Sequence, residues 1–138
     1  MEFIYISVLA VALVAVCVTI HYETLRGLSS IAHQPGRHRW LVLISMYGAL
    51  TAHIVEIWVF AGGYWLAEQL GLGAIDTIKD PFDYIYYSSM VYTTVGFGDL
   101  IPSAGMRLLT SAEALAGLAL ITWSASFTYL QMQRLWRE

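Results

Sequence analysis

Three stretches of the 138-residue sequence are each long and apolar enough to cross a membrane, and this constrains the fold more than any other feature. They comprise residues 3–22, 40–67 and 108–132. Each contains at most two acidic or basic side chains. A helix rises about 1.5 Å per residue, so twenty residues reach about 30 Å, the thickness of the hydrocarbon core. The sequence therefore predicts three transmembrane helices. The first is expected to be retained and not cleaved as a signal peptide, because no positive segment precedes it.

The composition excludes several classes of protein. Hydrophobic residues make up 58% of the chain and charged residues 12%, about half the charged fraction of a soluble domain. The formal net charge of −3 provides no basic surface for nucleic acid. Cys17 is the single cysteine, so an intrachain disulfide is impossible. We expect no nucleic-acid partner and a lipid bilayer as the surroundings.

A shorter helix is predicted between the second and third apolar stretches. Asp80 can cap it, Pro81 suits its first turn, and Asp83 places negative charge near its positive end. Residues 82–93 would span about 18 Å as a helix, which is half a membrane. Gly96 and Gly98 then alternate with bulkier residues and do not favour a continuing helix. This pattern predicts a re-entrant loop, which is tolerated only inside protein or beside water.

The sequence of this loop, Thr-Thr-Val-Gly-Phe-Gly-Asp at residues 93–99, resembles the selectivity-filter signature of potassium channels. The similarity extends from about Trp40 to the C-terminus. It implies an all-α membrane protein with three transmembrane helices, a re-entrant pore helix and a selectivity filter, assembled as a tetramer. The segments expected from it are an extra N-terminal helix at 1–25, a cytoplasmic loop at 26–39, and a pore domain at 40–138, which divides into an outer helix at 40–67, a turret at 68–80, a pore helix at 81–93, a filter at 94–98 and an inner helix at 106–133.

The resemblance also implies which atoms bind the ions. The backbone carbonyls of Thr94, Val95, Gly96 and Phe97, with the Thr94 hydroxyl, are expected to replace the hydration shell of K⁺ ions, and Gly98 completes the filter. The Val95 and Phe97 side chains are expected to point back into the protein. Carbonyls can all face one axis only if ordinary and left-handed backbone conformations alternate, which glycine permits. One chain supplies one wall, so four chains are needed.

Four further residues are expected to support the filter: Thr93, Asp99, Met90 and Tyr87. Two departures from the signature affect them. Phe97 stands where tyrosine is common, so a phenolic hydroxyl is missing. Met90 stands where some relatives carry a glutamate that pairs with the aspartate after the filter. Asp99 must therefore bind water, a tyrosine or another partner.

The third transmembrane helix carries a polar stripe formed by Thr122, Ser126, Tyr129 and Gln133, spaced by four, three and four residues. Polar groups facing lipid are costly, so the stripe is expected to face a water-filled cavity or, alternatively, another helix. Gly117 falls near the glycine about which inner helices of the resembled family bend. Close packing through a small residue is the alternative interpretation.

His53 and Glu56 share one face of the second transmembrane helix, and Glu113 lies within the third. Ionisable residues inside a membrane are functional hypotheses by default. Three interpretations stay open: polar contacts between helices, a pH-sensitive modulatory site that includes Glu113, or a metal site. A metal site is weakly indicated because a third ligand is missing. The pH-sensitive interpretation predicts that conduction changes between pH 5 and pH 8 and that His53→Gln abolishes the change.

Basic residues predict the orientation, because cytoplasmic loops are rich in Lys and Arg. Five of the seven fall in the first loop and the C-terminal tail; these are Arg26, Arg37, Arg39, Arg134 and Arg137. We therefore expect a multi-pass protein of the plasma (cell inner) membrane with its N-terminus outside and its C-terminus in the cytoplasm.

The expected function is passive, potassium-selective conduction through a homotetramer, with no other protein partner. A weakly selective cation channel and a non-conducting modulatory subunit are the alternatives. An enzyme is not expected, because the sequence offers no nucleophile with its base and no phosphate-binding loop.

Overall fold

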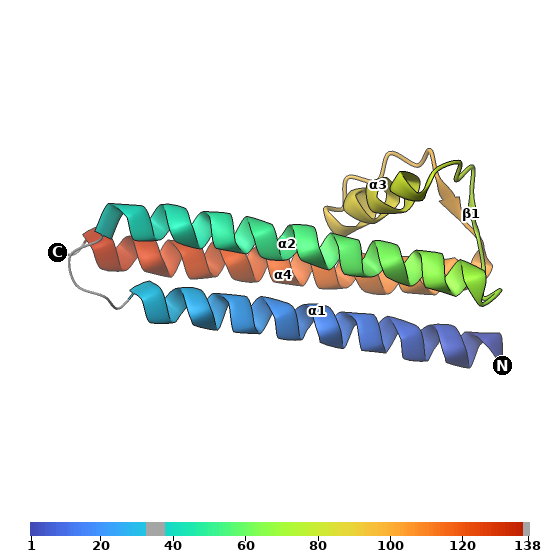
Figure 1. The fold of residues 1–138 in the computed structure, drawn as a ribbon, viewed down its shortest axis with the longest axis horizontal. Helices are drawn as coiled ribbons and strands as arrows, with labels where there is room; N and C mark the ends of the chain where they lie inside the picture. Colours follow the sequence, from blue (N-terminus) through green and yellow to red (C-terminus); the bar gives the residue numbers. More distant parts are fainter. Residues whose placement is uncertain (33–37, 137–138) are drawn as a thin grey trace.

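A computed structural model describes residues 1–32 and 38–136. Its elements in chain order are α1 (Glu2–Ala32), α2 (His38–Gln69), β1 (Ile75–Asp76), α3 (Pro81–Tyr92), β2 (Ile101–Pro102) and α4 (Ala104–Trp136). The three long helices lie side by side, and α3 packs on one side of α2 and α4, towards the end that carries β1 (Figure 1). All three are long and apolar enough to cross a membrane. The predicted all-α membrane architecture is therefore confirmed.

The long helices extend beyond their predicted bounds. α1 continues to Ala32 and α2 begins at His38, so part of the loop predicted at 26–39 is helical. No proline interrupts residues 26–32; the first one is Pro35, and helices usually end before a proline. Residues 33–37 lie outside the described residues. α4 likewise exceeds the predicted 106–133 by two residues at its start and three at its end.

Both ends of α3 are defined by hydrogen bonds. At its start, the Asp80 carboxylate accepts from the Phe82 amide at 2.9 Å. The Asp83 carboxylate accepts from the amides of Lys79 and Asp80, which lowers the pKa of Asp83. This cap therefore stabilises α3 fully when the pH is above the ordinary carboxyl pKa. The stabilisation is lost as the pH falls through the lowered pKa of Asp83. At the other end, Thr93 caps the helix, whose last residue is Tyr92, one residue earlier than predicted.

A short two-stranded ladder closes the loop that contains α3 and the segment after it. β1 and β2 are antiparallel, with Ile75 opposite Pro102 and Asp76 opposite Ile101. Next to the ladder, the Ser103 amide donates to the Ala74 carbonyl at 2.8 Å. The ladder thus joins the segment before α3 to the start of α4, so both ends of the re-entrant segment are anchored.

α4 passes very close to the C-terminal end of α3 at Gly117. A Cβ atom built at Gly117 would lie 2.2 Å from the backbone oxygen of Tyr92 and 2.9 Å from its carbonyl carbon. Real Cβ atoms do not approach backbone so closely, so only glycine fits here. α4 runs unbroken through this position. Gly117 thus allows α4 to pack closely on α3, as the packing interpretation expects. A bend of α4 about Gly117 stays a prediction.

We predict that Gly117→Ala destabilises the fold by about 1–3 kcal/mol, because the backbone of Tyr92 must move to admit the methyl group. Gly62→Ala is the matched control, since Gly62 is also helical and, in the part of the chain that the structure describes, no atom beyond its own helix backbone and chain neighbours lies within 4 Å of its Cβ position. It should be neutral or stabilising by up to about 1 kcal/mol. Thermal unfolding of both variants in detergent measures the difference. Equal unfolding midpoints would contradict the close approach.

Candidate functional site

The segment from Thr94 to Gly98 has an alternating backbone. Thr94, Gly96 and Gly98 have φ values of 61°, 53° and 77°, in the left-handed region. Val95 and Phe97, between them, are not among the residues of positive φ. Left-handed φ at Thr94 is unusual for a residue with a branched side chain. This strict alternation is the backbone conformation that a row of carbonyls facing one axis requires.

Hydrogen bonds to the last turn of α3 hold the beginning of this segment. The Thr94 amide donates to the Val91 carbonyl at 3.0 Å, and the Gly96 amide donates to the Met90 carbonyl at 3.1 Å. The Thr93 hydroxyl donates to the Ser89 carbonyl at 2.7 Å. Met90 thus contacts the segment through its backbone carbonyl, and Thr93 caps the helix that precedes it; their role in supporting a filter stays a prediction.

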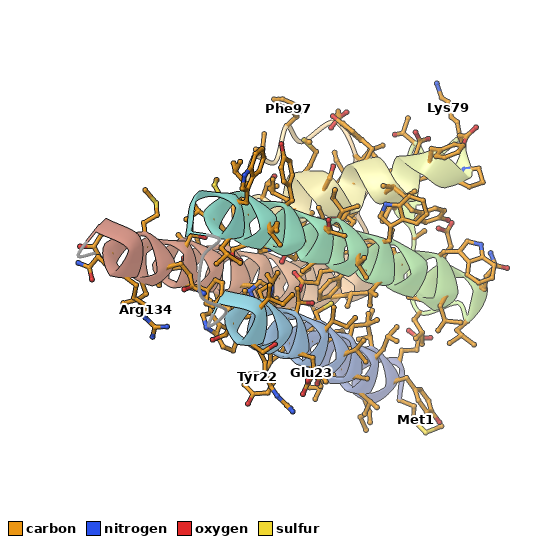
Figure 2. The ribbon with its side chains drawn as sticks, turned by 60° about the vertical axis from the view of Figure 1, so that its left-hand side comes forward. Met1, Tyr22, Glu23, Lys79, Phe97 and Arg134 are labelled. Carbon is orange, nitrogen blue, oxygen red and sulfur yellow. The ribbon has the colours of Figure 1, made fainter. Side chains whose placement is uncertain are left out.

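In the single chain the residues from Thr93 to Asp99 are all exposed. Val95 is 54% exposed and Phe97 is 71% exposed, and Phe97 projects away from the helices in Figure 2. One chain alone therefore leaves these two side chains uncovered, and the expectation that they point into the protein of the assembled channel stays a prediction. Their apolar surface is left without cover, since the chain's own helices lie on the other side of the segment.

Asp99 has the tyrosine partner that the sequence left as one of three options. The Tyr86 hydroxyl donates to the Asp99 carboxylate at 2.9 Å. This bond raises the pKa of the Tyr86 hydroxyl above its ordinary value. Tyr86 lies one helical turn before Met90. Met90 is the position at which some members of the resembled family carry a glutamate. A hydroxyl thus replaces a carboxyl as the link between the pore helix and the end of the filter segment.

Tyr87 supports the segment only through α3. Its ring meets the ring of Tyr64 edge to face, with centroids 5.0 Å apart. Its hydroxyl lies 2.8 Å from the Thr110 hydroxyl of α4. Tyr87 therefore fastens α3 to α2 and α4 on the side away from the filter segment.

The comparisons with known proteins support this arrangement. Residues 39–133 match the family model described as an ion channel. The chain belongs to this ion channel family. The recognition of a potassium-channel type of pore is thereby confirmed, and α1 lies outside the matched residues. The comparison with curated proteins and the comparison with solved structures give no match. The chain is thus a multi-pass membrane protein with an ion channel domain.

A buried polar cluster in this channel joins all four helices. The Glu56 carboxylate lies 2.9 Å from His21 Nδ1 and 3.2 Å from His53 Nδ1, and it accepts from the Tyr92 hydroxyl. The Ser124 hydroxyl lies 3.0 Å from His53 Nε2 and 3.2 Å from His21 Nε2. His53 and Glu56 are therefore paired as their spacing predicts, and His21 of α1 is a member that the sequence analysis did not include.

Glu113 does not join this cluster as expected but forms a second one. Its carboxyl oxygens lie 2.5 Å from the Tyr64 hydroxyl and 2.5 Å from the Ser88 hydroxyl. Ser88 also lies 2.8 Å from the Ile57 carbonyl. Glu113 is fully buried and binds α4 to α2 and α3. The separation follows from helix geometry, because Glu113 and Ser124 are three turns apart on α4.

The polar stripe of α4 lies largely on the surface of the single chain. Thr122, Ser126 and Tyr129 are exposed, and Gln133 donates to the Tyr129 hydroxyl at 2.7 Å. The hydroxyls of Thr122 and Ser126 bond to carbonyls one turn earlier in α4. The stripe is thus not used for packing against the chain's own helices, and its role in a cavity stays a prediction.

Some residues of the polar cluster were not predicted from the sequence, and one of them carried a signal there. His21 carried a signal, since it is the sole basic residue of its apolar stretch. Ser124 carried none, because its role depends on which helices meet.

We predict that Tyr86→Phe makes the conducting state less persistent, because Asp99 loses its hydroxyl partner while the ring remains. The rate of current decline at low external K⁺ should rise by up to about tenfold, the size expected for one hydrogen bond. Tyr84→Phe is the matched control, since the Tyr84 hydroxyl bonds to Glu68 instead. Patch-clamp recording of both variants measures the rates. Equal rates in Tyr86→Phe and wild type would contradict this role.

Proposed function

We propose that the chain forms a potassium-selective homotetrameric channel that conducts K⁺ passively. The alternating backbone of residues 94–98 carries this proposal. Carbonyls of Thr94, Val95, Gly96 and Phe97, with the Thr94 hydroxyl, would replace the hydration shell of each ion. Gly98 supplies the last left-handed position.

The exposure of the filter segment supports a fourfold assembly. One chain provides one wall and leaves Val95 and Phe97 uncovered, and apolar side chains of this size are expected to be covered by neighbouring subunits. A closed ion path around an axis needs cyclic symmetry, which a homotetramer provides. The site is therefore incomplete in a single chain.

The distribution of charge supports an orientation. The C-terminal ends of α1 and α4, whose last turns follow or contain Arg26 and Arg134 in the sequence, lie at one end of the long helices, and β1 lies at the other (Figure 1). Positive residues favour the cytoplasmic side. We place the N-terminus and the filter mouth outside and the C-terminus inside, in the plasma or cell inner membrane.

We predict that Gly98→Ala abolishes potassium selectivity or tetramer formation. The φ of 77° disfavours a Cβ by about 1–2 kcal/mol in each of four subunits. Among the described residues, no atom beyond the immediate chain neighbours of Gly98 lies within 4 Å of that Cβ, so within one chain the cost is conformational. Reversal potentials in mixed Na⁺ and K⁺, with native electrophoresis for assembly, provide the measurement, and Gly62→Ala is the control.

The same recordings separate the alternatives. A wild-type reversal potential that does not shift with the K⁺ gradient would favour a weakly selective cation channel. A monodisperse tetramer without single-channel events in a bilayer would favour a non-conducting subunit. Wild-type selectivity in Gly98→Ala would overturn the filter assignment itself.

We also predict that the polar stripe faces the aqueous cavity of the tetramer. In a Cys17→Ser background, cysteines introduced at Thr122, Ser126 and Tyr129 should react with water-soluble thiol reagents from the cytoplasmic side. Leu120→Cys is the control, because Leu120 is 2% exposed and should stay unreactive. Inert stripe positions would place this face against lipid or another helix.

A further inference from the structure

The buried cluster of His21, His53 and Glu56 has the composition of a metal site. Two imidazoles and one carboxylate form the His₂Glu donor set that zinc uses in proteins. The donor atoms of these three residues all lie within 4.8 Å of one another. Two of them come from α2, one turn apart, and the third comes from α1, which packs against α2 along its length. The third ligand that the sequence lacked is thus supplied by His21.

The distances suit a small four-coordinate cation. Bonds of 2.0–2.1 Å in a tetrahedron place the ligand atoms about 3.3 Å apart. His21 Nδ1 and His53 Nδ1 lie 2.9 and 3.2 Å from the two oxygens of Glu56. Small shifts would therefore admit an ion between them. The Tyr92 hydroxyl, 2.8 Å from His53 Nδ1, provides a fourth donor. Mg²⁺ and Ca²⁺ are disfavoured because they prefer oxygen ligands in larger number.

Ser124 can serve as the outer partner of both imidazoles. An imidazole that binds a metal through Nδ1 carries its hydrogen on Nε2, where an outer partner usually accepts it. Both Nε2 atoms face the one Ser124 oxygen, which has two lone pairs and can accept both hydrogens. Without an ion, the same contacts can be met by opposite tautomers, in which His53 donates from Nε2 to Ser124 and accepts from the Tyr92 hydroxyl, while His21 accepts from Ser124. The position of Ser124 therefore fits the metal-bound arrangement without requiring it.

The surroundings are compatible with a buried positive charge. The side chains of His21 and Glu56 are fully buried, and that of His53 is 14% exposed. The cluster lies at the C-terminal end of α3, which carries about half a negative charge. An apolar groove of about 630 Å³ between α2 and α4 borders the cluster and is lined in part by His53, Tyr92 and Ser124.

We propose that His21, His53 and Glu56 bind one divalent transition-metal ion, for which Zn²⁺ is the best fit. The ion would fasten α1 to the pore domain at Tyr92, the residue that precedes the capping residue Thr93 and the filter. α1 lies outside the family-matched residues, so the site gives this helix a specific attachment to the channel. Binding is measurable without current, so its outcome is independent of the proposed conduction.

The test is a titration of the full chain, purified in detergent and stripped with a chelator. We expect one Zn²⁺ per chain, and with Co²⁺ the intense visible absorption of a four-coordinate site. His21→Ala and His53→Ala should each abolish the Co²⁺ spectrum. Ser124→Ala keeps every ligand and should weaken binding about 10–100-fold. Glu113→Gln is the matched control, a buried glutamate outside the cluster, and should bind as wild type does.

Two results would overturn the proposal. A folded wild-type chain that binds no Zn²⁺ would show that the cluster is a hydrogen-bonded polar cluster and not a metal site. Binding that persists unchanged in the double variant His21→Ala/His53→Ala would place the ion elsewhere. If the alanine variants fail to fold, the wild-type titration and Ser124→Ala still decide the matter, since neither removes a ligand. In wild type, Zn²⁺ should also raise the midpoint of thermal unfolding.

Discussion

The position of Tyr92 determines how the rest of this channel is arranged. Its backbone carbonyl lies against Gly117 of α4, at a distance that leaves no room for a Cβ. Its hydroxyl donates to Glu56 of α2. The next residue caps α3 and begins the filter segment. One residue thus fixes the depth of the pore helix against two long helices, and the filter's starting point follows from it.

The helices and the left-handed glycines after α3 could be predicted from the sequence because their causes are local. Hydrophobic length predicts a membrane span, and Asp80-Pro81 marks a helix start whichever neighbours are present. The glycines at 96 and 98 indicate left-handed backbone in the same way. Thr94 shares that conformation although its side chain disfavours it, and its amide donates to the Val91 carbonyl of α3.

The polar clusters could be predicted only in part, because they depend on which helix faces which. Spacing places His53 and Glu56 on one face of α2, but no pattern within α2 indicates that His21 of α1 lies opposite. Glu113 appeared to be a candidate for the same cluster only because it too is ionisable and buried. The structure places it with Tyr64 and Ser88 instead.

α1 shows why a buried polar contact matters more in lipid than its energy suggests. Its most apolar window has a mean hydropathy of 2.8, and apolar side chains cover several of its faces, as Val8, Val11 and Val16 illustrate. Lipid tails are as apolar as these side chains, so burial alone does not select a rotation or depth for the helix. Hydrogen bonds between transmembrane helices are worth only about 1 kcal/mol each. His21 nevertheless satisfies both ring nitrogens only when it faces Glu56 and Ser124 together, and this requirement defines a single register of α1 on the pore domain.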